Sequence, residues 1–375
     1  MLPKKILLVF VLLAVFVSCR PKNRPQHSFY YWKTSFAYND SFSQSEIKKL
    51  GLHHFHIHYC DIDWSENLKM PVPRGALGYE AYKSKYFTSD SFTPVVFITN
   101  RTFQRVSDDW CDTLAVKLSN KIHTITGIIL GEYSRNFLQD SIPEGEWVHG
   151  GNALDSILKV ISNKKEQKIN EIQIDCDWNE GTKAKYFRFL KKFKELNKDK
   201  LVSVTIRLYP YKYPTKVGVP PVDKGMLMCY NLGNITNEAT LNSIFDINEL
   251  KKYMDGGKYP LPLDIALPLF SWQAWFRCGK YKGIIHGENF TEDTLAFKKI
   301  TSNITRFNQD TVINDIYFRE GDELRWESPN QADLEKAAEM IVNKNPAYSR
   351  IVFFDWNENS IKRNETLIQN IFRRF

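Results

Sequence analysis

Eight runs of strand-forming residues alternate with amphipathic stretches along this chain of 375 residues, and this alternation limits the folds open to it. The strand candidates lie at 28–35, 53–60, 93–99, 171–177, 201–208, 225–231, 262–269 and 350–356. Helical patterns lie between several of them, at 109–121, 152–165, 182–197, 247–255 and 331–344. Such repetition predicts parallel strands. Eight units in a chain of this length predict an α/β fold with a single (β/α)8 TIM-type barrel.

Two segments do not fit the simple repeat. Residues 122–150 contain another strand-like run, GIILGEY, and a glycine-rich loop, while residues 272–330 contain several short aromatic and charged runs. We expect both segments to be hairpins or loops inserted into the barrel. Because no linker or internal repeat separates a second globular unit, the sequence predicts one barrel domain over 28–375.

The first twenty residues carry an export signal. Lys4 and Lys5 precede an apolar run over 6–17, which is too short to span a bilayer. Ser18-Cys19 and the polar stretch RPKNRPQ follow, an order that resembles the lipobox of bacterial lipoproteins, although Phe16 stands where leucine is usual. The resemblance implies a signal peptide over 1–18, a diacylated Cys19 as membrane anchor and a tether over 19–27. An ordinary signal peptide cut nearby is the alternative. Either way we expect an exported protein of the cell envelope, in the periplasm or at the outer membrane.

The charge pattern argues against a nucleic-acid partner, and the cysteine spacing argues against disulfides and zinc. The formal charge is +8, but the basic residues alternate with acids and form no basic tail, so no nucleic-acid partner is expected. The five cysteines after Cys19 are scattered without C-x-x-C spacing, which indicates buried small hydrophobic residues and no disulfide framework or zinc site.

Polar residues gather at the end of the 171–177 strand. Strand alternation places Asp175, Asp177 and Asn179 on one face, and Arg207 ends the next strand along the chain. In a barrel the carboxyl ends of the strands form the functional mouth. Carboxylates there need a charged partner or a ligand, and Arg207 is the candidate partner. A purely structural network of aspartate and arginine is the alternative.

These residues carry a resemblance to a known family. IDCDWN at 174–179 resembles the Ile-Asp-x-Asp-Trp-Glu strand of chitinase-type, family 18 glycoside hydrolases. VSVTIRLYP, the Met228–Asn231 strand end, ALPLFSW at 266–272 and the last strand at 351–356 continue the likeness in order. The fuller pattern is similar to an uncharacterised group of bacterial lipoproteins with a hydrolase-like barrel. The resemblance implies a glycan ligand, catalytic roles for Asp175, Asp177 and Tyr230, and sugar contacts from Asn231, Trp272 and Trp356.

Departures from the family pattern bear on activity. Asn179 occupies the position of the family's general acid, and an amide cannot supply the proton that a glycosidic leaving group needs. We therefore expect no conventional chitinase activity. Other acids that could serve at the mouth are Glu180, Glu320, Asp355 and Glu132. Three functions stay open: a divergent glycoside hydrolase, a carbohydrate-binding barrel that lost its acid, and a structural envelope protein without a cleft.

Three histidines recur at every second position, at His54, His56 and His58, and so share one face of their strand. A His-x-His pair on a strand can chelate a metal, whereas histidines in a barrel are more often hydrogen-bonded core residues. Since the sequence offers no matching second pair, it predicts no metal and no cofactor.

Overall fold

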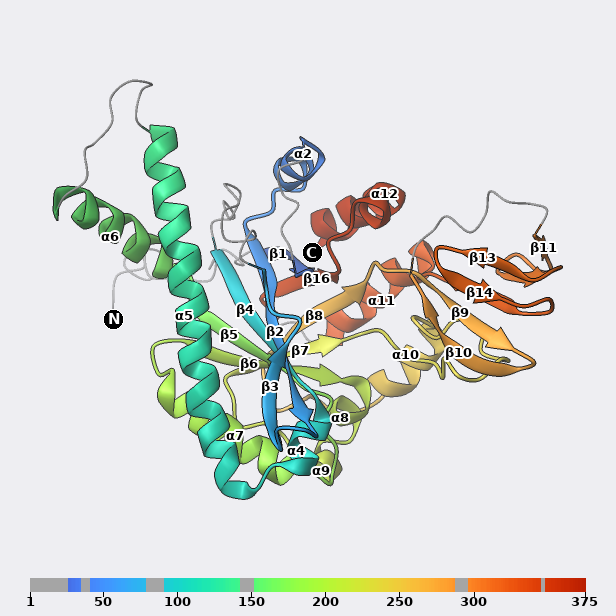
Figure 1. The fold of residues 1–375 in the computed structure, drawn as a ribbon, viewed down its shortest axis with the longest axis horizontal. Helices are drawn as coiled ribbons and strands as arrows, with labels where there is room; N and C mark the ends of the chain where they lie inside the picture. Colours follow the sequence, from blue (N-terminus) through green and yellow to red (C-terminus); the bar gives the residue numbers. More distant parts are fainter. Residues whose placement is uncertain (1–25, 35–40, 79–90, 142–151, 287–295, 345–347) are drawn as a thin grey trace, which may run out of the picture.

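The computed structural model describes residues 26–34, 41–78, 91–141, 152–286, 296–344 and 348–375. Eight parallel strands follow one another in the order β1-β16-β8-β7-β6-β5-β4-β2, and β1 also pairs with β2, which closes the barrel (Figure 1). The strands are β1 (Gln26–Tyr31), β2 (His54–Ser65), β4 (Ser91–Ile98), β5 (Glu171–Asp175), β6 (Leu201–Arg207), β7 (Lys224–Met228), β8 (Leu263–Pro268) and β16 (Arg350–Phe354). The predicted (β/α)8 barrel is confirmed, and β1 begins two residues before the expected domain start at residue 28.

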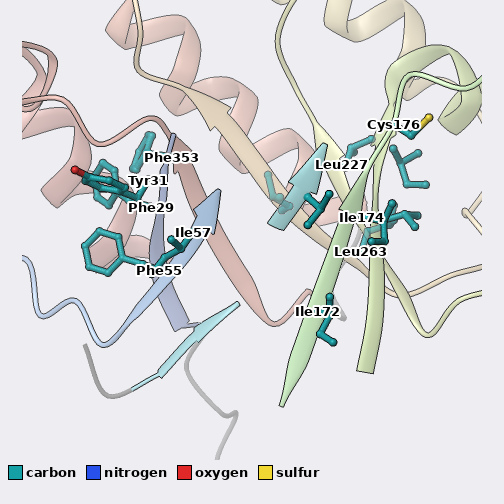
Figure 2. Packing of buried hydrophobic residues seen from close by; sticks show 14 of the residues in the cluster. Phe29, Tyr31, Phe55, Ile57, Ile172, Ile174, Cys176, Leu227, Leu263 and Phe353 are labelled. Carbon is teal, nitrogen blue, oxygen red and sulfur yellow. The ribbon is translucent and has the colours of Figure 1, made fainter. Parts of the chain in front are cut away.

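Alternation along each strand separates an outer apolar face from a more polar inner one. In β5, Ile172 and Ile174 belong to the large hydrophobic cluster that the outer faces of the strands form with the helices (Figure 2). Gln173 lies inside the barrel, where its side chain accepts a hydrogen bond from the Tyr30 hydroxyl at 2.5 Å. Because β5 is buried on both faces, its register is fixed, and with it the direction of the side chains at its carboxyl end.

Helices cover the outside of the barrel (Figure 1). They are α2 (Ser41–Lys49), α4 (Asn100–Arg105), α5 (Asp108–Ser141), α6 (Asn152–Glu166), α7 (Lys183–Leu196), α8 (Leu208–Lys212), α9 (Pro214–Val217), α10 (Ile247–Met254), α11 (Gln331–Lys344) and α12 (Glu358–Arg374). α7 packs against the barrel through one apolar face. The residues of this face recur at helical spacing and are all buried: Tyr186, Phe189, Leu190 and Phe193. No described helix is both long enough and apolar enough to cross a membrane.

The expectation of a strand or hairpin within 122–150 is wrong for the described part of that segment. GIILGEY lies in the interior of α5, a helix of 34 residues that continues the predicted helix at 109–121. Ile122, Ile125, Ile129 and Leu130 are buried along it. Their spacing of three to four residues is helical, and burial of this stripe outweighs the strand preference of β-branched residues. Residues 142–151 lie outside the described residues.

The second insertion is a β-rich lobe between β8 and α11. Its five-stranded sheet has the order β10-β9-β15-β12-β11, from β9 (Trp272–Arg277), β10 (Lys280–Ile285), β11 (Phe297–Lys299), β12 (Ile304–Phe307) and β15 (Glu323–Glu327). A separate ribbon pairs β13 (Thr311–Ile313) with β14 (Ile316–Phe318), and β3 (Met70–Arg74) forms a hairpin on β2. Cys278 is exposed in the turn after β9, contrary to the expected burial, whereas Cys60, Cys111, Cys176 and Cys229 are buried.

A buried charge cluster fills the amino-terminal end of the barrel. Glu171 is fully buried, with its carboxylate 3.2 Å from the Lys224 ammonium and in contact with the Arg350 guanidinium. Asp264 contacts Lys224 and lies 3.8 Å from Arg350. Burial alone would raise the pKa of Glu171, but the two cations lower it to about 2. This paired cluster closes the end of the barrel opposite the predicted mouth.

Candidate functional site

The structure has a cavity of about 380 Å³ at the carboxyl ends of the strands. Its walls come from β4, β5, β6 and β7 and from the segments that follow β5, β6 and β7. The residues that line it are Phe97, Asp175, Asp177, Arg207, Leu208, Tyr209, Met228, Tyr230, Asn231, Leu232 and Tyr253. Five of the sequence-predicted site residues therefore lie together: Asp175, Asp177, Arg207, Tyr230 and Asn231.

Asp175 is the buried carboxyl at the base of this cavity. It ends β5, is 9% exposed and accepts a hydrogen bond of 2.5 Å from the Thr205 hydroxyl. Burial raises the pKa of Asp175 to about 7, with a further rise from the Asp177 charge, while the Thr205 hydrogen bond and the Arg207 charge oppose it. Asp175 can therefore hold or release a proton near neutral pH.

Asp177 and Arg207 form an ion pair at the edge of the cavity. The Arg207 Nε atom lies 3.1 Å from Asp177 Oδ1, and both side chains are about half exposed. Arg207 also donates a hydrogen bond of 2.7 Å to the Trp178 carbonyl oxygen, which fixes the direction of the guanidinium. The pair leaves further carboxylate and guanidinium hydrogen-bonding positions open to a ligand.

Tyr230 belongs to a cluster of aromatic side chains at the mouth. Its buried ring lies 5.6 Å from the Phe354 ring and 5.8 Å from the Phe270 ring, centre to centre. Burial raises the pKa of the Tyr230 hydroxyl, which keeps this group a neutral hydrogen-bond donor. Trp32 extends the cluster, since its ring centre lies 5.4 Å from that of Phe354.

The Asn179 side chain is hydrogen-bonded to the backbone of its own turn. Its side-chain oxygen accepts a hydrogen bond of 3.0 Å from the Gly181 N–H, and the Thr182 hydroxyl contacts both its amide oxygen and its carbonyl. This turn leads into α7 and explains an asparagine at this position. Glu180 lies on the outside, 3.3 Å from the Lys216 ammonium. Neither Asn179 nor Glu180 lines the cavity.

The remaining predicted residues are spread over the mouth, the lobe and the core. Trp272 donates its indole N–H to Glu327 at 3.0 Å, and the Glu320 backbone N–H donates to Asp310 at 2.9 Å, both within the lobe. Neither of them lines the cavity. Asp355 follows Phe354 at the carboxyl end of β16, and it too is absent from the cavity lining.

The prediction of Trp356 as a sugar platform is wrong. Its side chain is 3% exposed and packs edge-on against Phe29 at 5.0 Å and Phe55 at 5.3 Å in the cluster between barrel and helices. The aromatic residue of the last strand that does lie at the mouth is Phe354. Glu132, another acid considered from the sequence, lies on α5 and pairs with Arg135.

The histidines of β2 lie inside the barrel and make side-chain hydrogen bonds. His54 bonds to Ser91 at 2.7 Å and to Thr93 at 3.0 Å, and His56 lies 3.1 Å from the Ser28 hydroxyl. Burial lowers the pKa of both His54 and His56. Within the described residues no group of His, Cys, Asp or Glu side chains has the arrangement of a metal site.

Sequence reasoning missed several residues that shape the site. Tyr209 and Tyr253 line the cavity from α8 and α10. Trp32 was also missed: its ring is tilted against that of His58, with ring centres 4.5 Å apart. His58 bonds to Asp61 at 2.8 Å, and the Asp61 charge raises the pKa of Asp175. The YPYKY run after Arg207 and the WKTS run after β1 were the available signals, because aromatic residues just past barrel strands fall at the mouth.

Comparisons with known proteins give no family assignment. No family model matches the chain, and no curated protein matches it. Among solved structures, the Bacillus cereus spore cortex-lytic enzyme SleL is similar with a TM-score of 0.48 and 12% identity, over 93% of this chain and 75% of that one.

Two other solved structures are similar over nearly their whole length. A fungal endo-beta-N-acetylglucosaminidase from glycosyl hydrolase family 18 has a TM-score of 0.44 and 8% identity, over 93% of this chain and 99% of that one. The xylanase and alpha-amylase inhibitor protein XAIP-II from Scadoxus multiflorus has a TM-score of 0.43 and 8% identity, over 93% and 98%. At these values the likenesses carry no argument about activity or ligand, and the barrel rests on its own strand pairing.

Proposed function

We propose that this protein is a glycan-handling barrel of the cell envelope that binds a sugar chain in the cavity at the carboxyl ends of its strands. The observation that carries the proposal is the composition of the cavity wall. Asp177 and Arg207 offer hydrogen-bonding groups beside the rings of Tyr209, Tyr230 and Tyr253. Sugars need both, because their hydroxyls form hydrogen bonds and their apolar faces pack on rings. A purely structural role was expected to come without a cleft, so the cavity counts against it.

Conventional chitinase chemistry is not part of the proposal. The family resemblance implies a general acid at position 179, where this chain has an asparagine whose side chain holds the turn before α7. The neighbouring carboxylate, Asp177, is paired with Arg207. A glycosidic bond breaks slowly without a positioned acid, since general acid catalysis contributes about 10²–10⁴ in rate.

A divergent hydrolase is the second candidate, and Asp355 favours it. Burial raises the pKa of Asp355, against the opposing charge of Lys33, so its carboxyl tends to keep a proton. Its charge also reaches Tyr230, beside Asp175. Asp355 would donate its proton to the leaving oxygen, while the Asp177 carboxylate would take a proton from a solvent water that attacks the anomeric carbon, so that the bond to water forms as the glycosidic C–O bond breaks. In that case Asp355→Asn abolishes turnover of the cleaved glycan and leaves its binding intact.

Glycan binding is tested with the chain from Arg20 onward, which keeps every described residue. A glycan array identifies a bound sugar, and calorimetry then measures its affinity. We expect Tyr209→Ala to weaken binding by about tenfold or more, since this half-exposed ring lines the cavity. Tyr317→Ala is the matched control, because Tyr317 is similarly exposed but lies on β14 in the lobe. Equal effects of the two changes, or no glycan bound at all, would contradict the proposal.

The envelope location is also a proposal. It rests on the leader at 1–18 and on Cys19, both outside the described residues. We propose that Cys19 is acylated and that the chain is thereby held at a membrane surface, with a glycan of the envelope as its partner. The mature amino terminus tests this directly.

A further inference from the structure

α5 and α6 extend past the amino-terminal end of the barrel (Figure 1). α5 starts soon after β4 and α4, at the carboxyl ends of the strands, and its 34 residues span about 50 Å. That length exceeds the height of the barrel strands, the longest of which has 12 residues. α6 then leads back to β5. The two helices therefore form a projection on the end of the barrel opposite the glycan cavity.

The contacts between the two helices define which face of α6 is turned outward. Ser162 bonds to Ser134 of α5 at 2.6 Å, and the Lys165 ammonium lies over the Tyr133 ring at 4.6 Å. Successive helical residues are rotated by about 100°, so Ile157, Val160 and Lys164 lie about 140–160° around α6 from Ser162. They occupy the face that points away from α5.

This outward face combines apolar side chains with positive charge. Val160 is 67% exposed and Ile157 is 41% exposed, and the two lie one turn apart on the same helix face. Of the four lysines in residues 152–168, Lys164 lies on the same face as the two apolar residues, whereas Lys165 is turned toward α5. Apolar residues flanked by lysines are the pattern of helices that lie in the surface of an anionic bilayer.

A lipid anchor at the amino terminus would place a membrane at this same end of the barrel. β1 begins at Gln26 and runs in parallel with β5, so the chain enters the barrel at its amino-terminal end. An acyl chain on Cys19 would be joined to it by residues 20–25, which reach at most about 20 Å. A lipid anchor would thus hold the end that carries the α5–α6 projection close to the bilayer.

We propose that the outward face of α6, formed by Ile157, Val160 and Lys164 and called here the α6 surface, binds the headgroup region of an anionic phospholipid bilayer. The arrangement rests on the proposed envelope location, but the contact itself needs no acyl chain. With the α6 surface on the membrane, the glycan cavity at the opposite end of the barrel would face away from the bilayer. The membrane contact would then fix the direction in which the cavity presents itself to envelope glycans.

Vesicle co-sedimentation tests the contact with the unacylated chain from Arg20 onward. Vesicles of phosphatidylcholine and phosphatidylglycerol are compared with vesicles of phosphatidylcholine alone. We expect binding to the anionic vesicles, lost on adding salt, and a decrease of about tenfold for Val160→Asp. Leu241→Asp, at a more exposed apolar residue between β7 and α10, is the matched control and should bind like the unchanged chain.

Three results would overturn the proposal: no binding to either vesicle, equal losses for Val160→Asp and Leu241→Asp, or a dimer in solution that Val160→Asp dissociates. The last would assign the α6 surface to a second copy of the chain. Circular dichroism of Val160→Asp excludes misfolding as the cause of a loss. Because glycan binding is measured on the same chain without vesicles, its failure and the failure of membrane contact are distinguishable.

Discussion

Replacing Asp175 by asparagine should stabilise the protein at alkaline pH and much less in acid. The folded state raises the pKa of Asp175 to about 7 because the carboxylate is buried, whereas an unfolded aspartate has a pKa of about 3.9. Between these two values the folded state binds more protons than the unfolded chain. Its stability therefore falls as pH rises from about 4 to about 7, and the loss is complete above pH 7. Asparagine has nearly the same shape, can still accept from Thr205 and cannot ionise.

The size of this free-energy penalty follows from the pKa shift of Asp175. Three pKa units at about 1.4 kcal/mol each give a penalty of about 4 kcal/mol at pH 8.5 and of about 1.5 kcal/mol at pH 5. The difference in the free energy of unfolding between Asp175→Asn and the unchanged chain should therefore grow by about 3 kcal/mol between these two pH values. Removal of the Asp177 charge should lower the pKa of Asp175 and reduce this change.

Urea unfolding at about pH 5 and about pH 8.5, followed by tryptophan fluorescence, measures the difference. Asp199→Asn is the control, because this exposed carboxyl precedes β6 at the opposite end of the barrel. Its effect should be the same at both pH values. If Asp175→Asn also shifts stability equally at the two pH values, or destabilises the protein more in alkali than in acid, then burial does not hold a proton on Asp175 and the reasoning about this site fails.

Three further predictions concern other parts of the chain. Glu171→Gln should destabilise the fold by about 3–5 kcal/mol at pH 7 in urea unfolding, because it leaves Lys224 and Arg350 without their shared carboxylate. Because its folded pKa is depressed, the stabilisation from Glu171 should disappear as pH falls from about 4 towards 2; an unchanged midpoint at pH 7 would contradict this role. The unchanged chain should not cleave chito-oligosaccharides in a mass-spectrometric assay. Asn179→Glu should not restore cleavage, because the side chain at position 179 lies in the turn before α7 and outside the cavity. Turnover by the unchanged chain would show that the motif was misinterpreted. Mass spectrometry of the mature protein should find an acylated Cys19 at the amino terminus, and an unmodified terminus cut elsewhere would exclude the anchor.

Periodicity was sufficient to predict the barrel. In each of the eight strand candidates most of the described residues are buried, and each candidate contains an apolar run, a pattern that a barrel strand shows over five to eight residues. The same reasoning failed for GIILGEY, because a short apolar run is compatible with either a strand or a buried helix. Its place in α5 is decided by a stripe that continues from Leu114 and Leu118, outside the run itself.

The site was predicted where strand parity decides the direction of a side chain. Asp175 and Arg207 end strands of fixed register, so their direction into the mouth follows from alternation. Asp177, two residues past the end of β5, still lines the cavity, but alternation does not hold farther along the chain. Asn179 lies two residues beyond Asp177, but the turn into α7 takes its side chain, and Trp356 follows β16 into the core while Phe354 stays at the mouth.

The two ends of β5 show how neighbouring charges decide what a buried carboxyl can do. Glu171 and Asp175 lie on the same inner face of one strand, four residues apart. Glu171 contacts two cations, which lower its pKa and keep it ionised at the closed end of the barrel. Asp175 instead contacts a neutral hydroxyl and lies beside another carboxylate, and Arg207, the nearby cation, is paired with Asp177. A carboxyl left in this state is a net cost to folding above neutral pH, and such a cost is tolerated where a ligand or a proton is to be held. For this reason we propose that the ligand binds at the Asp175 end of the barrel.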